Sequence, residues 1–197
     1  MALFEQKAPA IMAALIRDLG MADYQAGGVL GNIGWECGGF QHLSQIGGTA
    51  RGWVQWDGAR KKQFLAWCEK NGLVWTSDEA NYRYLVLELR GSEHAALVAL
   101  LKTRTLVEAS DTFEEKFERA GKPALSGRRR FARQAMDAYA ASDKKPLTFG
   151  PAPPPQPAPL PPRPPDMDGP VTPPQPAQSG GFFNALFALL RRLFGKE

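Results

Sequence analysis

Prolines divide this chain of 197 residues into parts with different folding potential. Fifteen of its 17 prolines fall within residues 146–176. Proline lacks a backbone N–H group, so a segment this rich in it forms neither helices nor sheet ladders and is expected to be an extended, disordered spacer. We therefore predict a globular domain over residues 1–145, a Pro-rich linker over 146–179 and an apolar C-terminal segment over 180–197.

The spacing of apolar residues predicts a mainly helical globular domain. Apolar side chains recur every three to four positions up to Gly20, which is expected to end the first helix. Residues 40–58 contain several turn signals and predict a loop with a small β-hairpin. Further helices are predicted over about 23–36, 59–71, 79–90, 92–102, 110–119 and 126–141. The helix predicted over 23–36 contains four glycines, which cost helix stability and so indicate close packing against a neighbour: Gly27, Gly28, Gly31 and Gly34.

Composition sets outer limits on the partners of this chain. The net charge of +4 favours an anionic partner such as a cell wall or a membrane surface. Cys37 and Cys68 are expected to be buried free thiols, because nothing in their spacing demands a disulfide. The N-terminus does not read as a signal peptide, since Glu5 and Pro9 interrupt it. No apolar run is long enough to span a membrane as a helix.

A single acidic residue stands out in the text between residues 26 and 60. Glu36 ends an apolar helical run, follows Trp35 and precedes two glycines. A carboxyl group beside an apolar wall has the surroundings that raise its pKa, and a protonated carboxyl group is what breaking a glycosidic bond requires. We interpret Glu36 as a candidate general acid. The alternative is a solvated carboxylate at a helix end.

These segments resemble the bacteriophage tail lysozyme family of the lysozyme-like superfamily. AGGVLGNIGWECGGF followed by GWVQWDGARKK is similar to the family's pattern of Gly-Asn-(Ile/Leu), Glu-Ser-Gly-Phe and then Gln-Trp-Thr-Gly-x-Arg. Residues 81–85 with Glu88-Leu89, residues 113–121 and residues 130–135 resemble its later helices. The resemblance covers about residues 8–141. It implies a lysozyme-like α+β fold with a small β-hairpin.

The resemblance also implies a function. It indicates a muramidase, either an endolysin or a virion-associated lysin, that cleaves the β-1,4 bond between N-acetylmuramic acid and N-acetylglucosamine of bacterial peptidoglycan. Glu36 stands at the position of the catalytic acid, and Gln55 and Trp56 stand on the hairpin that lines the sugar cleft. We expect a monomer without a cofactor, made in the host cytoplasm and acting on the host cell wall or within the virion.

Two departures from the family pattern leave the mechanism open. Cys37 replaces the serine that follows the catalytic acid, and Asp57 replaces a threonine. Asp57 is a candidate second carboxylate, and its alternative is an ordinary Asp-Gly turn. Without a second acid, the alternative mechanism is that of a lytic transglycosylase, in which a hydroxyl of the sugar itself reacts and the product is an anhydro sugar. A non-catalytic module that binds peptidoglycan or builds the tail is the alternative of a different class.

Other polar and aromatic residues have competing interpretations. Trp53, Trp56 and Tyr82 are candidates for stacking on sugar rings or for core packing. The two histidines, at positions 42 and 94, have no partners at metal-ligand spacing, so no metal site is expected. The arginines at positions 128–130 suggest the solvated face of a helix, and we expect no nucleic-acid binding.

The C-terminal segment predicts an amphipathic helix. Residues 182–194 separate into an apolar arc and a polar arc on a helical wheel. Such a helix is about 20 Å long, too short for a hydrocarbon layer of about 30 Å, so it suits the membrane interface. Docking on a protein surface is the alternative. The predicted membrane contacts are Phe182, Phe183, Leu186, Phe187, Leu190, Arg191, Arg192 and Phe194.

Overall fold

Helices account for most of the part of the chain that the structure describes. The computed structural model describes residues 2–149. Most of the predicted linker and the whole predicted C-terminal helix, with its eight proposed membrane contacts, lie outside this range. The described elements are α1 (Leu3–Leu19), α2 (Asp23–Glu36), α3 (Gly58–Lys70), α4 (Asp78–Arg90), α5 (His94–Leu100), α6 (Leu106–Phe113), the π-helical turn η1 (Glu114–Glu118) and α7 (Leu125–Ala140).

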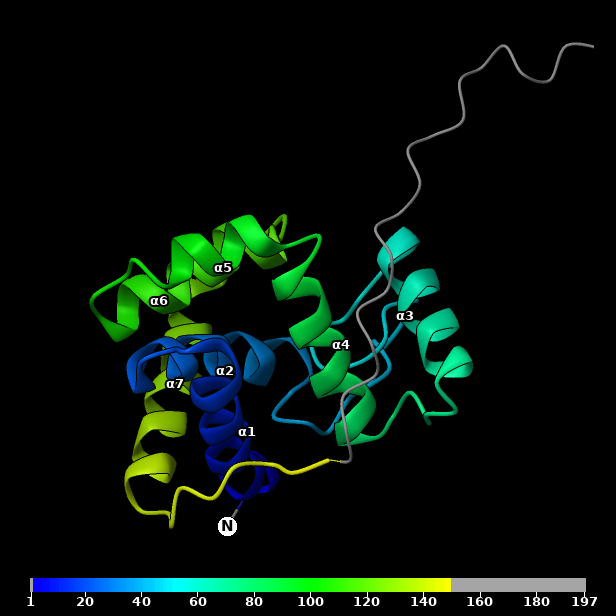
Figure 1. Ribbon diagram of the computed structural model, residues 1–197. Coiled ribbons are helices and arrows are strands. Elements are labelled where there is room, and N and C mark those ends of the chain that lie inside the picture. Colours follow the sequence, from blue (N-terminus) through cyan, green and yellow to red (C-terminus); the bar gives the residue numbers. More distant parts are fainter. Residues whose placement is uncertain (1, 150–197) are drawn as a thin grey trace, which may run out of the picture. The chain divides into compact units, whose positions relative to one another are not determined.

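Helix α2 is the buried centre of this arrangement. It contacts α1, α6 and α7, whereas α3 and α4 lie together on another side (Figure 1). A β-carbon added at Gly28 would lie 2.7 Å from the backbone nitrogen of Ser110 in α6, and one added at Gly31 would lie 2.6 Å from the carbonyl oxygen of Arg128 in α7. Only glycine allows backbones to approach so closely. The predicted close packing of the α2 glycines is confirmed.

Helix boundaries follow local signals closely in most places. Gly20 adopts a left-handed conformation at φ 67° and ends α1 as predicted. The helices predicted over 59–71, 79–90 and 126–141 are present within one residue at each end. The helix predicted over 110–119 is wrong in form. Thr105 caps α6 by accepting a hydrogen bond from the backbone N–H of Glu108, so this helix starts earlier, and its continuation after Phe113 is the π-helical turn.

The predicted β-hairpin is the main correction to the fold. Residues 2–149 contain no β-strand, only isolated antiparallel bridges that pair Arg51 with Ser44 and with Trp56. Gly52 at φ 80° and Gln55 at φ 50° turn the backbone twice within four residues, which leaves no length for a ladder. The described fold is therefore mainly helical, as predicted, without the α+β element.

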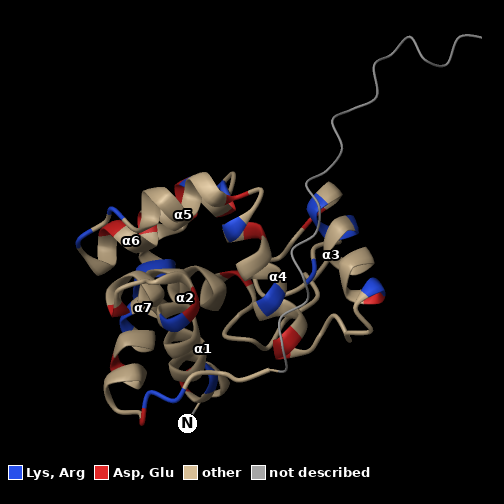
Figure 2. Cartoon of the chain, in the orientation of Figure 1, with Lys and Arg blue, Asp and Glu red and all other residues tan. Residues whose placement is uncertain are grey.

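The charges and thiols of the described residues add little constraint on partners. Both signs of charge occur on α1, α3, α4 and α7 instead of gathering on one element (Figure 2). Cys37 and Cys68 are buried free thiols, as predicted. Within residues 2–149, no helix has both the length and the apolar character needed to cross a membrane.

Candidate functional site

Glu36 lies where the buried helix α2 ends. Its side chain is 20% exposed, and its Oε1 accepts a hydrogen bond of 2.5 Å from Nη2 of Arg128 in α7. The Arg128 side chain is only 1% exposed. Sequence reasoning placed this arginine on a solvated helix face, and that prediction is wrong, because α7 packs directly against α2 at this point. The predicted acid thus has a buried cation as its neighbour.

A chain of hydrogen bonds fixes Arg128 in place. Its Nε donates to the carbonyl of Pro123 at 2.7 Å, and its Nη1 donates to Oδ1 of Asn32 at 3.0 Å. The amide of Asn32 donates in turn to the carbonyls of Gly28 and Ser110, both at 2.9 Å. Each of the three guanidinium nitrogens of Arg128 therefore donates a hydrogen bond. The arginine is held in one orientation and fixes the Glu36 carboxyl group from within the core.

A second carboxyl group, that of Glu118, feels the charge of Glu36. Glu118 is the last residue of η1, and its Oε1 is buried without a hydrogen-bond partner. Burial raises the pKa of Glu118 well above its usual range, the charge of Glu36 raises it further, and Arg128 and Arg60 oppose the shift. Sequence reasoning missed this residue. The sequence Phe117-Glu118-Arg119 was noted only for its resemblance to a later helix of the family.

Cys37 closes the turn directly after Glu36. Its Sγ donates to the carbonyl of Ile33 at 3.1 Å and accepts from the backbone N–H of Phe40 at 3.3 Å. Burial raises the pKa of the Cys37 thiol to about 12. The thiol is therefore neutral at physiological pH and takes a structural role at this helix end.

Two of the predicted substrate contacts are accessible on the loop before α3. Gln55 is partly exposed, and its Nε2 donates to the carbonyls of Gly52 at 2.7 Å and His42 at 3.1 Å. The side chain of Asp57 is 60% exposed. A hydrogen bond from the Thr49 hydroxyl, 2.6 Å long, lowers the pKa of Asp57. Asp57 is the extended N-cap residue of α3, with φ −130° and ψ 171°, and Gly58 already belongs to the helix.

The three aromatic candidates lie in the core. Trp53 packs edge-on against Phe40 with ring centres 5.3 Å apart, and Trp56 packs against Phe64 at 4.3 Å. Tyr82 is buried in α4 and donates a hydrogen bond of 2.7 Å to Asp18. Trp35, by contrast, is 41% exposed beside Glu36, and its ring lies against Gly127 at the start of α7.

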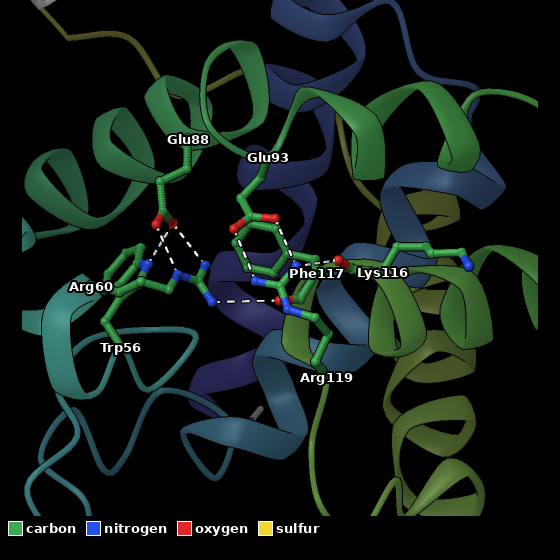
Figure 3. Close-up of polar contacts among 7 residues, drawn as sticks. All are labelled: Trp56, Arg60, Glu88, Glu93, Lys116, Phe117 and Arg119. Carbon is green, nitrogen blue, oxygen red and sulfur yellow. Dashed lines mark hydrogen bonds and ion pairs between the residues drawn. The ribbon is translucent and has the colours of Figure 1, made fainter. Parts of the chain in front are cut away.

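A polar network joins the loop, α3, α4 and η1 (Figure 3). Glu88 accepts hydrogen bonds from Nε1 of Trp56 at 2.6 Å and from two nitrogens of Arg60 at 2.9 Å each. The guanidinium of Arg60 also lies over the Phe117 ring, 4.5 Å from its centre, and donates to the Phe117 carbonyl at 3.4 Å. The network thus attaches the residue that precedes Glu118 to the aromatic loop.

Comparison with known proteins agrees with the resemblance in the sequence. A model of the family described as phage tail lysozyme matches residues 6–139. This range includes Glu36, Glu118 and Arg128, and it confirms the resemblance over about residues 8–141. No curated protein and no solved structure matches the chain. Among residues 2–149, no group of three or more His, Cys, Asp or Glu side chains is arranged to hold a metal ion.

Proposed function

Because the chain belongs to the phage tail lysozyme family, whose name indicates a role in the lysis of peptidoglycan, we propose that it cleaves the β-1,4 bond between N-acetylmuramic acid and N-acetylglucosamine. The observation that carries this proposal is the placement of Glu36. It ends a buried helix, and a buried arginine orients it. A carboxyl group with a defined orientation and limited access to water suits the protonation of a leaving group.

We assign Glu36 the role of general acid. Its Oε1 is bonded to Arg128, whereas its Oε2 has no hydrogen bond to any residue within 2–149 and is the oxygen that meets the sugar. The bond between the anomeric carbon and the glycosidic oxygen breaks, and the oxygen keeps the electron pair and takes the proton. A water molecule then bonds to the anomeric carbon and returns a proton to the site.

The loop residues have separate roles in this proposal. Gln55 and Asp57 are accessible and supply polar contacts to the sugar. Trp53, Trp56 and Tyr82 are buried, so we assign them to the support of the loop and of α4. The site of action is the host cell wall, reached either during lysis or from the virion.

Mass spectrometry of the soluble products from purified peptidoglycan tests this function. We expect reducing muropeptides from the wild-type protein and a loss of about 10²-fold or more with Glu36→Gln. Glu115→Gln, a change at an exposed glutamate of η1, is the matched control and retains the activity. Anhydro products would mean that the protein is a lytic transglycosylase and not a hydrolase. Binding to peptidoglycan without any product would instead favour a non-catalytic module.

A further inference from the structure

Trp35 is the one exposed aromatic residue among residues 2–149. It is 41% exposed, whereas Trp53, Trp56 and Trp67 are buried and Trp75 is half-buried. Single exposed apolar residues are common on protein surfaces, so exposure alone assigns no role to Trp35. Two further observations distinguish it from the other exposed apolar residues: the way in which its ring is held, and the residue that lies next to it.

The indole of Trp35 is held against a glycine of α7. A β-carbon added at Gly127 would lie 2.2 Å from Cζ3 and 2.3 Å from Cε3 of the ring, so only glycine leaves room for the indole at this position. Gly127 lies in the first turn of α7, and its φ is not in the left-handed region that favours glycine. Glycine costs helix stability at such a position. What Gly127 provides in return is the space for the ring.

The same contact between α2 and α7 holds the candidate acid. Trp35 and Glu36 are the last two residues of α2, and they meet two consecutive residues in the first turn of α7. The indole lies against Gly127, and the carboxyl group of Glu36 is bonded to Arg128. The exposed ring and the oriented acid are therefore neighbours on two packed helices, which hold side chains more precisely than a loop does.

The indole has the chemistry that binds a sugar ring. One face of a pyranose ring carries C–H groups, which the electron-rich face of an aromatic ring attracts, and the contact removes apolar surface of both from water. Nε1 of Trp35 forms no hydrogen bond with any residue within 2–149, so its N–H is available to a sugar hydroxyl. A tryptophan side chain has only two rotatable bonds and loses little conformational freedom when it binds.

We propose that the Trp35 indole is a stacking platform for one sugar ring of the glycan strand, beside the bond that Glu36 cleaves. This inference rests on the proposed function and adds a substrate-binding residue to it. Stacking on a fixed ring orients the strand, so that the glycosidic oxygen meets the carboxyl group of Glu36. Gly127 does not touch the sugar and acts through the ring, as a positioning residue.

Binding of purified glycan strands, freed of their peptides, tests the platform. In the full chain carrying Glu36→Gln, which leaves the strand intact, we expect the addition of Trp35→Ala to raise the Kd about ten-fold or more. Trp35→Phe keeps an aromatic ring and is expected to raise it less. Gly127→Ala displaces the ring and is expected to weaken binding too. Val107→Ala, at an apolar residue of α6 that is 44% exposed, is the matched control. A Kd that Trp35→Ala leaves unchanged, or no binding by either protein, would overturn the proposal.

Kinetics on the same strands separate binding from a structural role. With Glu36 intact, we expect Trp35→Ala to raise KM by a similar factor and to change kcat less, because the lost contact is with the bound strand. A structural role would lower the melting temperature and the amount of active protein, which reduces the apparent kcat and leaves KM unchanged. That second pattern would overturn the proposal.

The indole N–H signals in the NMR spectrum of the full chain test the contact without reference to cleavage. The signal absent from Trp35→Phe identifies residue 35, and we expect it to shift when the glycan strands are added. The signal of Trp67, which is buried in α3, is the internal control. A Trp35 signal that does not move would refute the platform. A shift in a wild-type protein that releases no products would refute the proposed cleavage and leave the platform intact.

Discussion

Helix α2 and the loop that follows it position the candidate site by different means. In α2 the close contacts are between backbones, because Gly28 and Gly31 have no side chains to separate the helices. In the loop over residues 37–57, large aromatic side chains fill the core, and a buried carboxylate, Glu88, binds them to α3. The first arrangement is sensitive to added volume, and the second is sensitive to the loss of a charge.

The loss of Glu88 is expected to have the largest effect on stability. Glu88→Ala leaves Nε1 of Trp56 and the guanidinium of Arg60 without their acceptor, and we expect the free energy of unfolding to fall by about 3 kcal/mol. Chemical denaturation measures the change. Glu69→Ala, at an exposed position of α3, is the matched control. Equal effects of the two substitutions would mean that the network does not hold the loop.

Added volume in α2 is expected to rank second. The new β-carbon of Gly31→Ala would meet the Arg128 carbonyl and Ala132 at 2.6 Å, so the helices must separate. We expect a loss of about 2 kcal/mol and reduced activity, because Arg128 moves with α7. Gly121→Ala, where nothing lies within 4 Å of the added carbon, is the control. Thermal unfolding of both variants tests whether the close backbone contact between α2 and α7 stabilises the protein.

Replacing the buried glutamate Glu118 is expected to stabilise the protein, unlike the two preceding substitutions, and the gain depends on pH. The pKa of Glu118 is raised in the folded state, so the wild-type protein loses stability as pH rises from the usual glutamate pKa towards that raised value. Glu118→Gln is therefore expected to be more stable than wild type at neutral pH and equal at acid pH. The gap grows by about 1.4 kcal/mol per pH unit at most. Melting temperatures from pH 4 to 8 measure it, and a gap that is independent of pH would contradict this explanation.

The smallest expected effect is at Asp57. Asp57→Asn keeps an acceptor for the Thr49 hydroxyl at an exposed position, so stability is expected to be almost unchanged and activity to stay within about two-fold. Muropeptide release measures the activity. A loss comparable with that of Glu36→Gln would instead make Asp57 the second carboxylate of the reaction.

Features with local causes could be predicted from the sequence. Gly20 ends α1 because it accepts a left-handed conformation, and the α2 glycines indicated a close helix contact before its partner was known. Short sequence motifs around Glu36 and over residues 52–60 also indicated the family, and the family match confirms it. The strand pairing of the hairpin failed because two positive φ angles, at Gly52 and Gln55, left the loop too tightly turned for a ladder.

The tertiary structure decided which charges are buried and which of them meet. Arg128 lies 92 residues from Glu36 in the sequence, in a run of arginines of which Arg130 is exposed, and only the contact of α7 with α2 distinguishes it. Glu118 looks like any other glutamate of its acidic segment until the fold buries its Oε1 without a hydrogen-bond partner. The sequence by itself determined the family, most helix limits and the candidate acid, because these depend on neighbouring residues. Burial and pairing depend on which distant segments come into contact, so the surroundings of that acid were decided by the fold.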